Sequence, residues 1–198
     1  TILGAGYGMG AQKFQDQLKT FGFDMELHEA RRVIKIYRET NHQINRLWRD
    51  AQLFLKDDNA FGKEGVLFVE DGRKDDRILL PSGLHLRYDD LQFTTTDKGV
   101  EFDYKTRRGR VRIYGGKIIE NVCQAIARCI IGEQMLRINK KYKVVLTVHD
   151  SIVCCVKDNE VAAAQTYVEE CMRWTPDWAT GLPVDCESGT GKSYGDCE

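Results

Sequence analysis

A change of hydrophobic periodicity near residue 60 constrains the fold of this chain more than any other feature. Before it, residues 24–57 carry apolar side chains at steps of three and four, the period of one helix face. After it, residues 62–113 consist of short β-branched or aromatic runs separated by turn sequences such as PSG and TDKG. A helical part followed by an antiparallel β-meander predicts the α+β fold class.

The helical stripe predicts a single helix about 50 Å long over residues 24–57. Asp24 suits the N-cap of this helix, and Glu26 suits its first turn. We interpret the stripe as core packing. A dimeric coiled coil is the alternative, and it is weakened because only one helix carries the pattern.

The second half of the chain returns to helical and then apolar patterns. We expect a helix over about 115–139, two apolar strands at 144–148 and 152–156, and a further helix over about 158–173, followed by a polar tail. These patterns divide the chain into three parts, which are residues 1–61, 62–113 and 114–198.

Composition narrows the class of protein. A chain of 198 residues can bury one sizeable core, and its formal net charge of -1 argues against a globally basic nucleic-acid coat. The seven cysteines include no pair at zinc-binding spacing, so we expect the reduced thiols of a cytoplasmic protein. No apolar run approaches the ~20 residues that a membrane span needs, so no membrane partner is expected. Because the chain begins with Thr1, we expect it to be part of a longer protein.

Two glycine-rich stretches imitate phosphate-binding motifs. Gly6, Gly8 and Ala11 fit the G-x-G-x-x-A dinucleotide fingerprint, but a long helix and a meander follow instead of alternating strands and helices. The tail CESGTGKS ends like a phosphate-binding loop, yet Cys186 stands at the position of the first glycine. No helix can follow it, and a helix N-terminus is what such a loop needs. We interpret the tail as a glycine-rich turn.

The stretch LGAGYGMG, residues 3–10, poses a different question. It carries four glycines into a helical run, where each costs ~1 kcal/mol relative to alanine. Something must therefore approach this backbone closely.

The stretch VVLTVHDSIVCCV places Asp150 in the turn between two strands that are apolar on both faces. An ionised carboxylate at the edge of a buried sheet costs several kcal/mol unless it is paired, hydrogen-bonded or bound to a cation. Asp150 is therefore a candidate metal ligand, with an Asx turn as the alternative. His149, the neighbouring residue, is either part of the same site or a histidine with a structural role.

A basic segment precedes the second long helix. Residues 104–119 contain six positive charges and no acid, and Arg108, Arg110 and Arg112 would share one face of a strand. This pattern suits a nucleic-acid backbone, with a solvated strand edge as the alternative. From this segment a polar line continues at every fourth residue through Arg112, Gly116, Glu120, Gln124 and Arg128.

Together these motifs resemble the family A DNA polymerases, the group of bacterial DNA polymerase I and many phage replicative enzymes. LGAGYGMGAQ looks like the C-terminal half of that family's fingers helix, with Tyr7 and Gly8 as its tyrosine–glycine pair. VHDS resembles the palm hairpin that presents a metal-binding aspartate. The resemblance runs almost the whole length of the chain and implies helical fingers, a meander insertion and a palm with an antiparallel sheet.

The resemblance also implies roles for individual residues. Asp150 would be catalytic and would bind Mg²⁺, and Leu3 and Tyr7 would bind the incoming dNTP. The expected primer–template contacts are Gly8, Gly10, Gln12, Arg108, Arg110, Arg112, Gly116, Glu120, Gln124 and His149. The nascent base pair would then be the group that approaches the glycine-rich backbone.

The sequence also departs from the family. Ser151 stands where the family usually has a glutamate, and Leu3 where it usually has a phenylalanine. Gly116 and Glu120 replace neutral hydrogen-bonding groups. The family's other metal-binding aspartate, and the lysine and arginine that hold the triphosphate, lie upstream of residue 1, so we expect a missing N-terminal polymerase segment.

The mechanism implied for the complete enzyme is two-metal nucleotidyl transfer to a primer 3′ end, in the cytoplasm of a bacterium or a phage-infected host. The chain alone would be inactive. Three rival hypotheses stay open: a non-catalytic DNA-binding module, one half of a split polymerase, and a metal-dependent nuclease. The last is the weakest, because Asp150 has no acidic neighbour in sequence.

Overall fold

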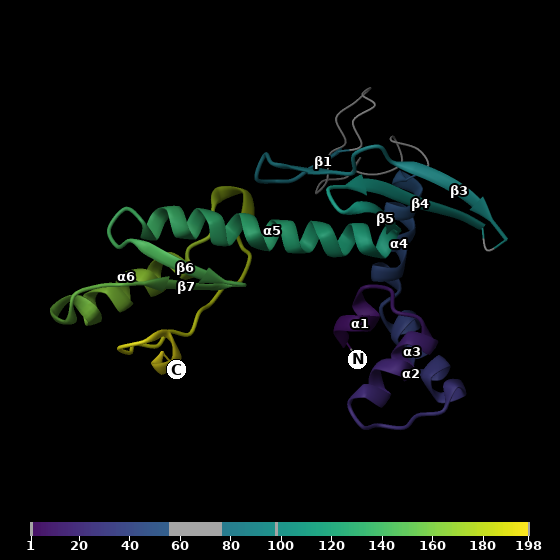
Figure 1. Ribbon diagram of the computed structural model, residues 1–198, viewed down its shortest axis with the longest axis horizontal. Coiled ribbons are helices and arrows are strands. Elements are labelled where there is room, and N and C mark those ends of the chain that lie inside the picture. Colours follow the sequence, from purple (N-terminus) through teal and green to yellow (C-terminus); the bar gives the residue numbers. More distant parts are fainter. Residues whose placement is uncertain (1, 56–76, 98, 198) are drawn as a thin grey trace. The chain divides into compact units, whose positions relative to one another are not determined.

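The computed structural model describes residues 2–55, 77–97 and 99–197 (Figure 1). Side chains are described for all of these residues except Ile2, Leu3 and Phe54. Helices and small antiparallel sheets confirm the α+β class. The chain divides into two compact units, Thr1–Cys123 and Gln124–Glu198. This boundary falls inside a helix, whereas composition suggested three parts.

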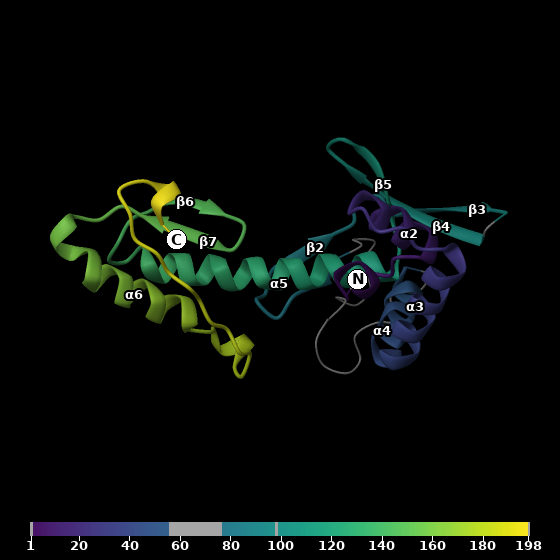
Figure 2. The same ribbon diagram turned by 90° about the horizontal axis from the view of Figure 1, so that it is seen from below.

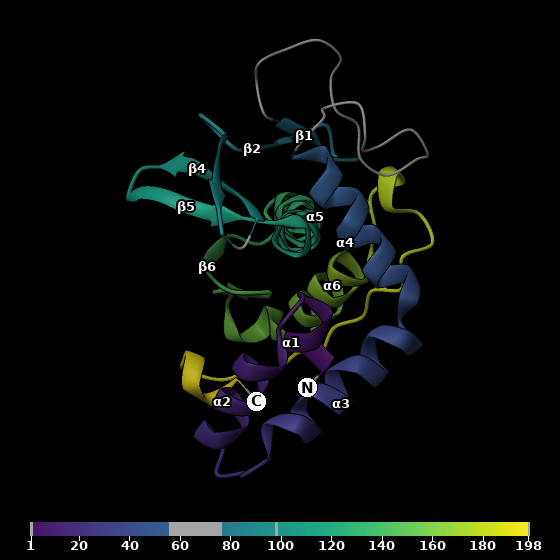
Figure 3. The ribbon, with the colours of Figure 1, turned by 90° about the vertical axis from the view of Figure 1, so that its right-hand side faces the viewer.

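The first unit begins with helices packed around a small apolar core. They are α1 (Ile2–Gly6), α2 (Ala11–Thr20), α3 (Leu27–Thr40) and α4 (His42–Phe54). α2 and α3 lie side by side, as Figures 1 and 3 show. Phe14 of α2 and Ile34 of α3 are buried between them, together with Ala5 and Ala30.

The prediction of one helix over residues 24–57 is wrong, because the helix is interrupted at Asn41. This residue has φ -104° and ψ 48°, outside the helical region. Its backbone N–H and its side-chain amide both donate to the carbonyl oxygen of Tyr37, each at 2.9 Å. An asparagine side chain that bonds to nearby backbone competes with helix continuation in this way.

Asp24 as the N-cap was also a wrong prediction, because α3 begins two residues later. Glu26 is the N-cap in an extended conformation, and the Glu29 carboxylate accepts a hydrogen bond from the Glu26 N–H at 3.3 Å. This reciprocal contact satisfies one of the amides that a helix start leaves unpaired.

The β-meander is confirmed within the described residues. A hairpin of β1 (Arg77–Leu79) and β2 (His85–Arg87) precedes a three-stranded antiparallel sheet of β3 (Gln92–Thr96), β4 (Gly99–Thr106) and β5 (Gly109–Ile113). The first part of the predicted meander, residues 62–76, lies outside the described residues.

The two faces of the three-stranded sheet differ in chemistry. On one face Phe102 and its partner Ile113 are 4% and 1% exposed and form part of the core. The opposite face carries charged side chains of β4 and β5, because successive residues of a strand alternate between faces. The predicted sharing of one strand face is confirmed for Arg110 and Arg112 but is wrong for Arg108, which lies in the turn before β5.

Helix α5 (Gly115–Ile138) contributes residues 115–123 to the first unit and 124–138 to the second. The second unit adds β6 (Val144–Val148), β7 (Ser151–Cys154), a 3₁₀ turn η1 (Asp158–Glu160) and α6 (Val161–Arg173). The hairpin and α6 pack along the C-terminal half of α5 (Figures 1 and 2). The core between them contains Ile138, Tyr142, Ala164 and Cys171. The predicted elements of this half are confirmed.

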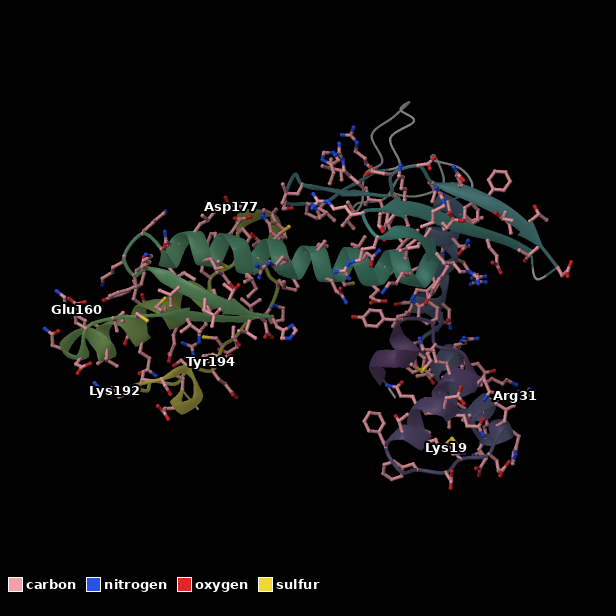
Figure 4. All side chains as sticks on the ribbon, viewed as in Figure 1. Lys19, Arg31, Glu160, Asp177, Lys192 and Tyr194 are labelled. Carbon is pink, nitrogen blue, oxygen red and sulfur yellow. The ribbon has the colours of Figure 1, made fainter. Side chains whose placement is uncertain are left out.

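Ion pairs join the C-terminal tail to α6 through Asp185 and to the turn η1 through Lys192. Arg173 contacts Asp185 at 2.8 Å and Glu169 at 2.9 Å, and Lys192, labelled in Figure 4, contacts Asp158 at 2.7 Å. Two short 3₁₀ turns lie along this tail, at Asp177–Ala179 and Tyr194–Asp196. The described residues after Ser193 form the 3₁₀ turn Tyr194–Asp196, whereas a phosphate-binding loop needs the N-terminus of a longer helix.

Among the described residues, no helix has both the length and the apolar character that crossing a membrane requires.

Candidate nucleic-acid interface

The Tyr7–Gly8 pair forms a tight turn between α1 and α2. The N–H of Gly8 donates to the carbonyl of Ala5 at 3.1 Å, and the N–H of Met9 donates to the carbonyl of Gly4, also at 3.1 Å. Gly8 has φ +83°, a left-handed conformation that glycine adopts without steric cost. The fingers-like motif is therefore a helix end followed by a turn.

The glycines of this motif serve different purposes. A side chain at Gly4 would overlap the end of Met9, so that glycine makes room inside the chain. Gly10 is exposed, and nothing described lies within 4 Å of where its Cβ would be. Of these glycines Gly10 has the most open backbone, and the approach of a base pair to the motif stays a prediction.

The start of α5 packs closely against the Tyr7 turn and α4. A Cβ on Gly116 would lie 3.2 Å from the Tyr7 carbonyl oxygen, and a Cβ on Gly115 would overlap the Trp48 carbonyl oxygen. The Gly115 N–H donates to Gln52 Oε1 at 2.8 Å. The structure thus brings together Tyr7, Gly8 and Gly116, which the sequence separates widely.

An open pocket of about 780 Å³ lies at this junction within the first unit. Its lining residues are Gly8, Arg38, Glu39, His42, Asn45, Trp48, Arg49, Gln52, Tyr114, Gly115 and Gly116. Two of the predicted primer–template residues, Gly8 and Gly116, are among them. Gln12 is not, and its amide instead donates to Gln15 and Asp16, both at 3.1 Å.

The arginines of β5 are engaged with carboxylates. Arg110 forms ion pairs with Asp90, at 2.7 Å, and with Asp103, and Arg112 pairs with Glu101. Hydrogen bonding from Arg110 lowers the pKa of the Asp90 carboxyl. A ligand phosphate would therefore compete with internal partners for these two residues.

Arg108 differs from its two neighbours. It lies in the turn between β4 and β5, is exposed, and forms no ion pair with the described residues. It is thus the member of the predicted arginine row whose charge is available to a ligand.

The predicted polar line on α5 begins at Gly116, because Arg112 belongs to strand β5 and not to the helix. Glu120 forms an ion pair with Lys117 at 2.6 Å. This pair offsets the negative charge of Glu120, which the sequence had placed near DNA. Gln124 lies one turn further along and is exposed.

In the second unit, the β6–β7 hairpin presents His149 and Asp150 at its tip. Val148 pairs with Ser151, so these two residues form the whole turn. His149 has φ +54°, a conformation that costs a residue with a side chain energy and is common at functional sites. Arg128 approaches the His149 carbonyl oxygen at 3.5 Å.

The Asp150 carboxylate is exposed and makes no hydrogen bond or ion pair within the described part of the chain. The expectation that it lies at the edge of a buried sheet is wrong for these residues, because Val145 and Leu146 of β6 are also about half exposed. Burial therefore places no cost on its charge here.

No group of three or more His, Cys, Asp or Glu side chains that could hold a metal occurs among the described residues. Asp150 has the hard oxygen ligands that Mg²⁺ prefers, and it fits one ligand position. The residues that the structure describes do not supply a complete two-metal site.

Sequence reasoning missed the polar face of α3 and α4. The apolar stripe of residues 24–57 was interpreted as core, and the cations between its members were not considered. Arg38, His42 and Arg49 line the pocket. Their steps of four and seven, about one and two helical turns, were a signal that could have identified a second, polar face.

The sequence of the chain is similar to that of a known phage protein. The chain is 28% identical to a DNA polymerase of Bacillus phage SP02 over 182 residues. The match covers 80% of this chain and 26% of that protein, so the chain spans about a quarter of its relative's length. No protein-family model and no solved structure matches. The chain is thus related to a phage DNA polymerase.

Proposed function

We propose that this chain is the C-terminal fingers and palm portion of a family A DNA polymerase, which extends a primer 3′ end by template-directed nucleotidyl transfer. One observation carries the proposal. The Tyr7–Gly8 turn and Gly116 of α5, from two motifs of the resemblance, meet beside one open pocket. The relationship to a phage DNA polymerase supports the same function.

In this proposal the pocket receives the new base pair. Tyr7 is half-buried at the turn, and Gly8 and Gly116 leave the adjacent wall without side chains. A flat base pair can approach the backbone at Gly8 closely, whereas the absent Cβ of Gly116 leaves room for the Tyr7 turn itself. Leu3, on the preceding helix α1, belongs to the same nucleotide-binding region of the family.

The β6–β7 hairpin supplies the catalytic carboxylate. Asp150 would hold Mg²⁺ together with carboxylates from outside this chain, and His149 would contact the primer terminus. When bound, Mg²⁺ would activate the primer 3′ hydroxyl and neutralise charge on the leaving pyrophosphate. Asp150 is suited to this role because no described side chain competes for its oxygens.

A non-catalytic DNA-binding module is the second candidate. It is favoured by one observation, that no metal-binding group of three or more ligands occurs in the described residues. The two candidates differ in what the complete polypeptide does with primed DNA, since a module binds it without extending it.

The proposal is tested by primer extension with the complete polypeptide that contains these residues. Asp150→Asn should reduce extension by ~10²-fold or more, because losing one positioned charge-stabilising group typically costs that much. The Asp150 carboxylate is exposed and makes no hydrogen bond within the described residues, which does not support the alternative of an Asx turn, so folding should be unchanged.

Asp177→Asn is the matched control, because Asp177 lies in an exposed 3₁₀ turn of the same unit. It should extend primers at the wild-type rate. Undiminished extension by Asp150→Asn would remove the metal-binding assignment, and binding of primed DNA with no extension by the wild type would favour the module.

A further inference from the structure

Two neighbouring open pockets lie along α3 and α4 in the first unit. A smaller pocket of about 330 Å³, which includes Arg31 and Lys35, shares Arg38 and Glu39 with the 780 Å³ pocket. We call the two pockets together the α3–α4 groove. Its defining residues are Arg31, Lys35, Arg38, Glu39, His42, Asn45, Arg49 and Tyr114. Those of α3 and those of α4 line the two pockets on either side of the interruption at Asn41.

The α3–α4 groove is strongly cationic. Four positive side chains line it, and Glu39 is its one carboxylate among the described residues. Lys35 and Glu39 are 3.8 Å apart and are 75% and 65% exposed, so this pair is weak. Arg31, Arg38 and Arg49 form no ion pair within the described chain. Their charges are therefore available to an anionic ligand.

The spacing of the cations indicates a polymer and not a small anion. Arg31 and Arg38 are separated by about 10 Å along α3, at 1.5 Å per residue, and Arg49 lies beyond them on α4. These groups cannot converge on one phosphate. Figure 4 shows Arg31 at the outer side of the helices, where a chain of charges could follow them. A ligand with regularly repeated negative charges satisfies them all.

One end of the α3–α4 groove carries an aromatic platform. Tyr114 is 45% exposed, and its ring lies over the glycine-lined wall, 3.8 Å from where a Cβ on Gly8 would be. Unpaired bases stack on exposed aromatic rings beside cationic grooves, whereas a duplex keeps its bases stacked inside. The combination favours a single strand.

We propose that the α3–α4 groove binds a single nucleic-acid strand, with phosphates on Arg31, Lys35, Arg38 and Arg49 and an unpaired base on Tyr114. This inference rests on the proposed function for the identity of the strand. In a polymerase the strand would be the unpaired template that leads toward the Tyr7 turn. Strand binding itself can be measured without any synthesis.

The test is fluorescence anisotropy of a labelled twelve-nucleotide oligo(dT) titrated with the 198-residue chain across a series of salt concentrations. Single strands give a log-log salt slope of about -0.7 per neutralised phosphate, so four contacts predict about -2.8. The double variant Arg31→Ala/Arg38→Ala should reduce the magnitude of the slope by about 1.4. Tyr114→Ala should weaken binding about tenfold with the slope unchanged, because stacking involves no counterion.

The matched control is Arg32→Ala/Arg46→Ala, which removes the same charge from the same two helices outside the α3–α4 groove. It should keep the wild-type slope. Circular dichroism establishes that each variant is folded.

Two results would overturn the inference. One is an equal loss of slope in both double variants, which would indicate general charge attraction. The other is equal competition by polyglutamate and unlabelled oligo(dT), which would indicate an acidic polypeptide. Primer extension by the complete polypeptide separates the two proposals, because extension without groove binding contradicts only this inference. Groove binding without extension contradicts only the proposed function.

Discussion

Gly116 packs directly against the backbone of Tyr7, so closely that a Cβ at residue 116 would lie 3.2 Å from the Tyr7 carbonyl oxygen. This contact joins the helix end of the fingers-like motif to the first turn of α5. The position of the turn therefore depends on the absence of a side chain at residue 116.

A graded series of alanine substitutions tests this packing. Gly115→Ala should destabilise the chain by about 1–3 kcal/mol, because its Cβ would overlap the backbone of α4. Gly116→Ala should cost less, because its neighbours need to shift by only a few tenths of an ångström. Gly132→Ala, on the same helix but with open space around it, should be stabilising by up to ~1 kcal/mol.

Urea-induced unfolding, followed by circular dichroism, measures the three free energies of unfolding. Equal stability of Gly115→Ala and Gly132→Ala would contradict the close packing of α5 on α4.

Tyr88 should make stability fall at high pH. Burial raises its pKa to about 12, against a hydrogen bond from Asn121 Nδ2 at 3.2 Å that lowers it. The unfolded chain, with a tyrosine pKa near 10, therefore loses the proton first as pH rises. The contribution of neutral Tyr88 to the free energy of unfolding is fully present below pH ~10. It is lost between about pH 10 and 12, a decrease on the order of 3 kcal/mol at most.

The measurement is urea unfolding of the wild type and Tyr88→Phe at several pH values between 9 and 12. The variant should show a shallower loss of stability across this range. Parallel pH profiles would show that Tyr88 is not the titrating group.

Arg110→Gln should lower the stability of the folded chain more at neutral pH than at low pH. Hydrogen bonding from Arg110 lowers the pKa of Asp90, so its stabilising effect is present above the unfolded pKa and lost as pH falls through the folded one. The difference in urea midpoint between wild type and variant should thus shrink between pH 6 and pH 2. Arg108→Gln, at an exposed residue without an ion pair in the described chain, should show no such trend.

The sequence predicted those elements that depend on local patterns better than those that depend on particular hydrogen bonds or tertiary contacts. Strand alternation and the period of α5 are local, so the meander and that helix were predicted well. The break at Asn41 depends on two hydrogen bonds to one carbonyl, which periodicity does not report. The apolar stripe continues across it unchanged.

The candidate site was predicted less completely. The motifs indicated Tyr7, Gly8 and Gly116, but their contact is tertiary and no spacing reveals it. Arg110 was predicted to be available to DNA, whereas the strand register brings it to Asp103. The cations of α3 stand between the apolar residues of the stripe. They line pockets that form only when helices pack together, which the sequence pattern does not report.

Tyr7→Ala should impair nucleotide binding more than the chemical step. If Tyr7 borders the nucleotide pocket, losing its ring should raise the KM for dNTP about tenfold in the complete polypeptide, equivalent to about 1.4 kcal/mol. Tyr7→Phe should retain most of the affinity because the ring remains. Lys19→Ala, at the far end of α2, is the control.

Steady-state kinetics of single-nucleotide addition separate KM from kcat for these variants. A fall in kcat with unchanged KM in Tyr7→Ala would place Tyr7 outside the nucleotide pocket.

The most direct measurement is single-nucleotide incorporation by the complete polypeptide on a primed template with Mg²⁺. The account predicts that the primer grows by one nucleotide with the complementary dNTP and remains unextended with each of the other three. Tight binding of the primed template with no extension by any dNTP, at any Mg²⁺ concentration, would contradict it.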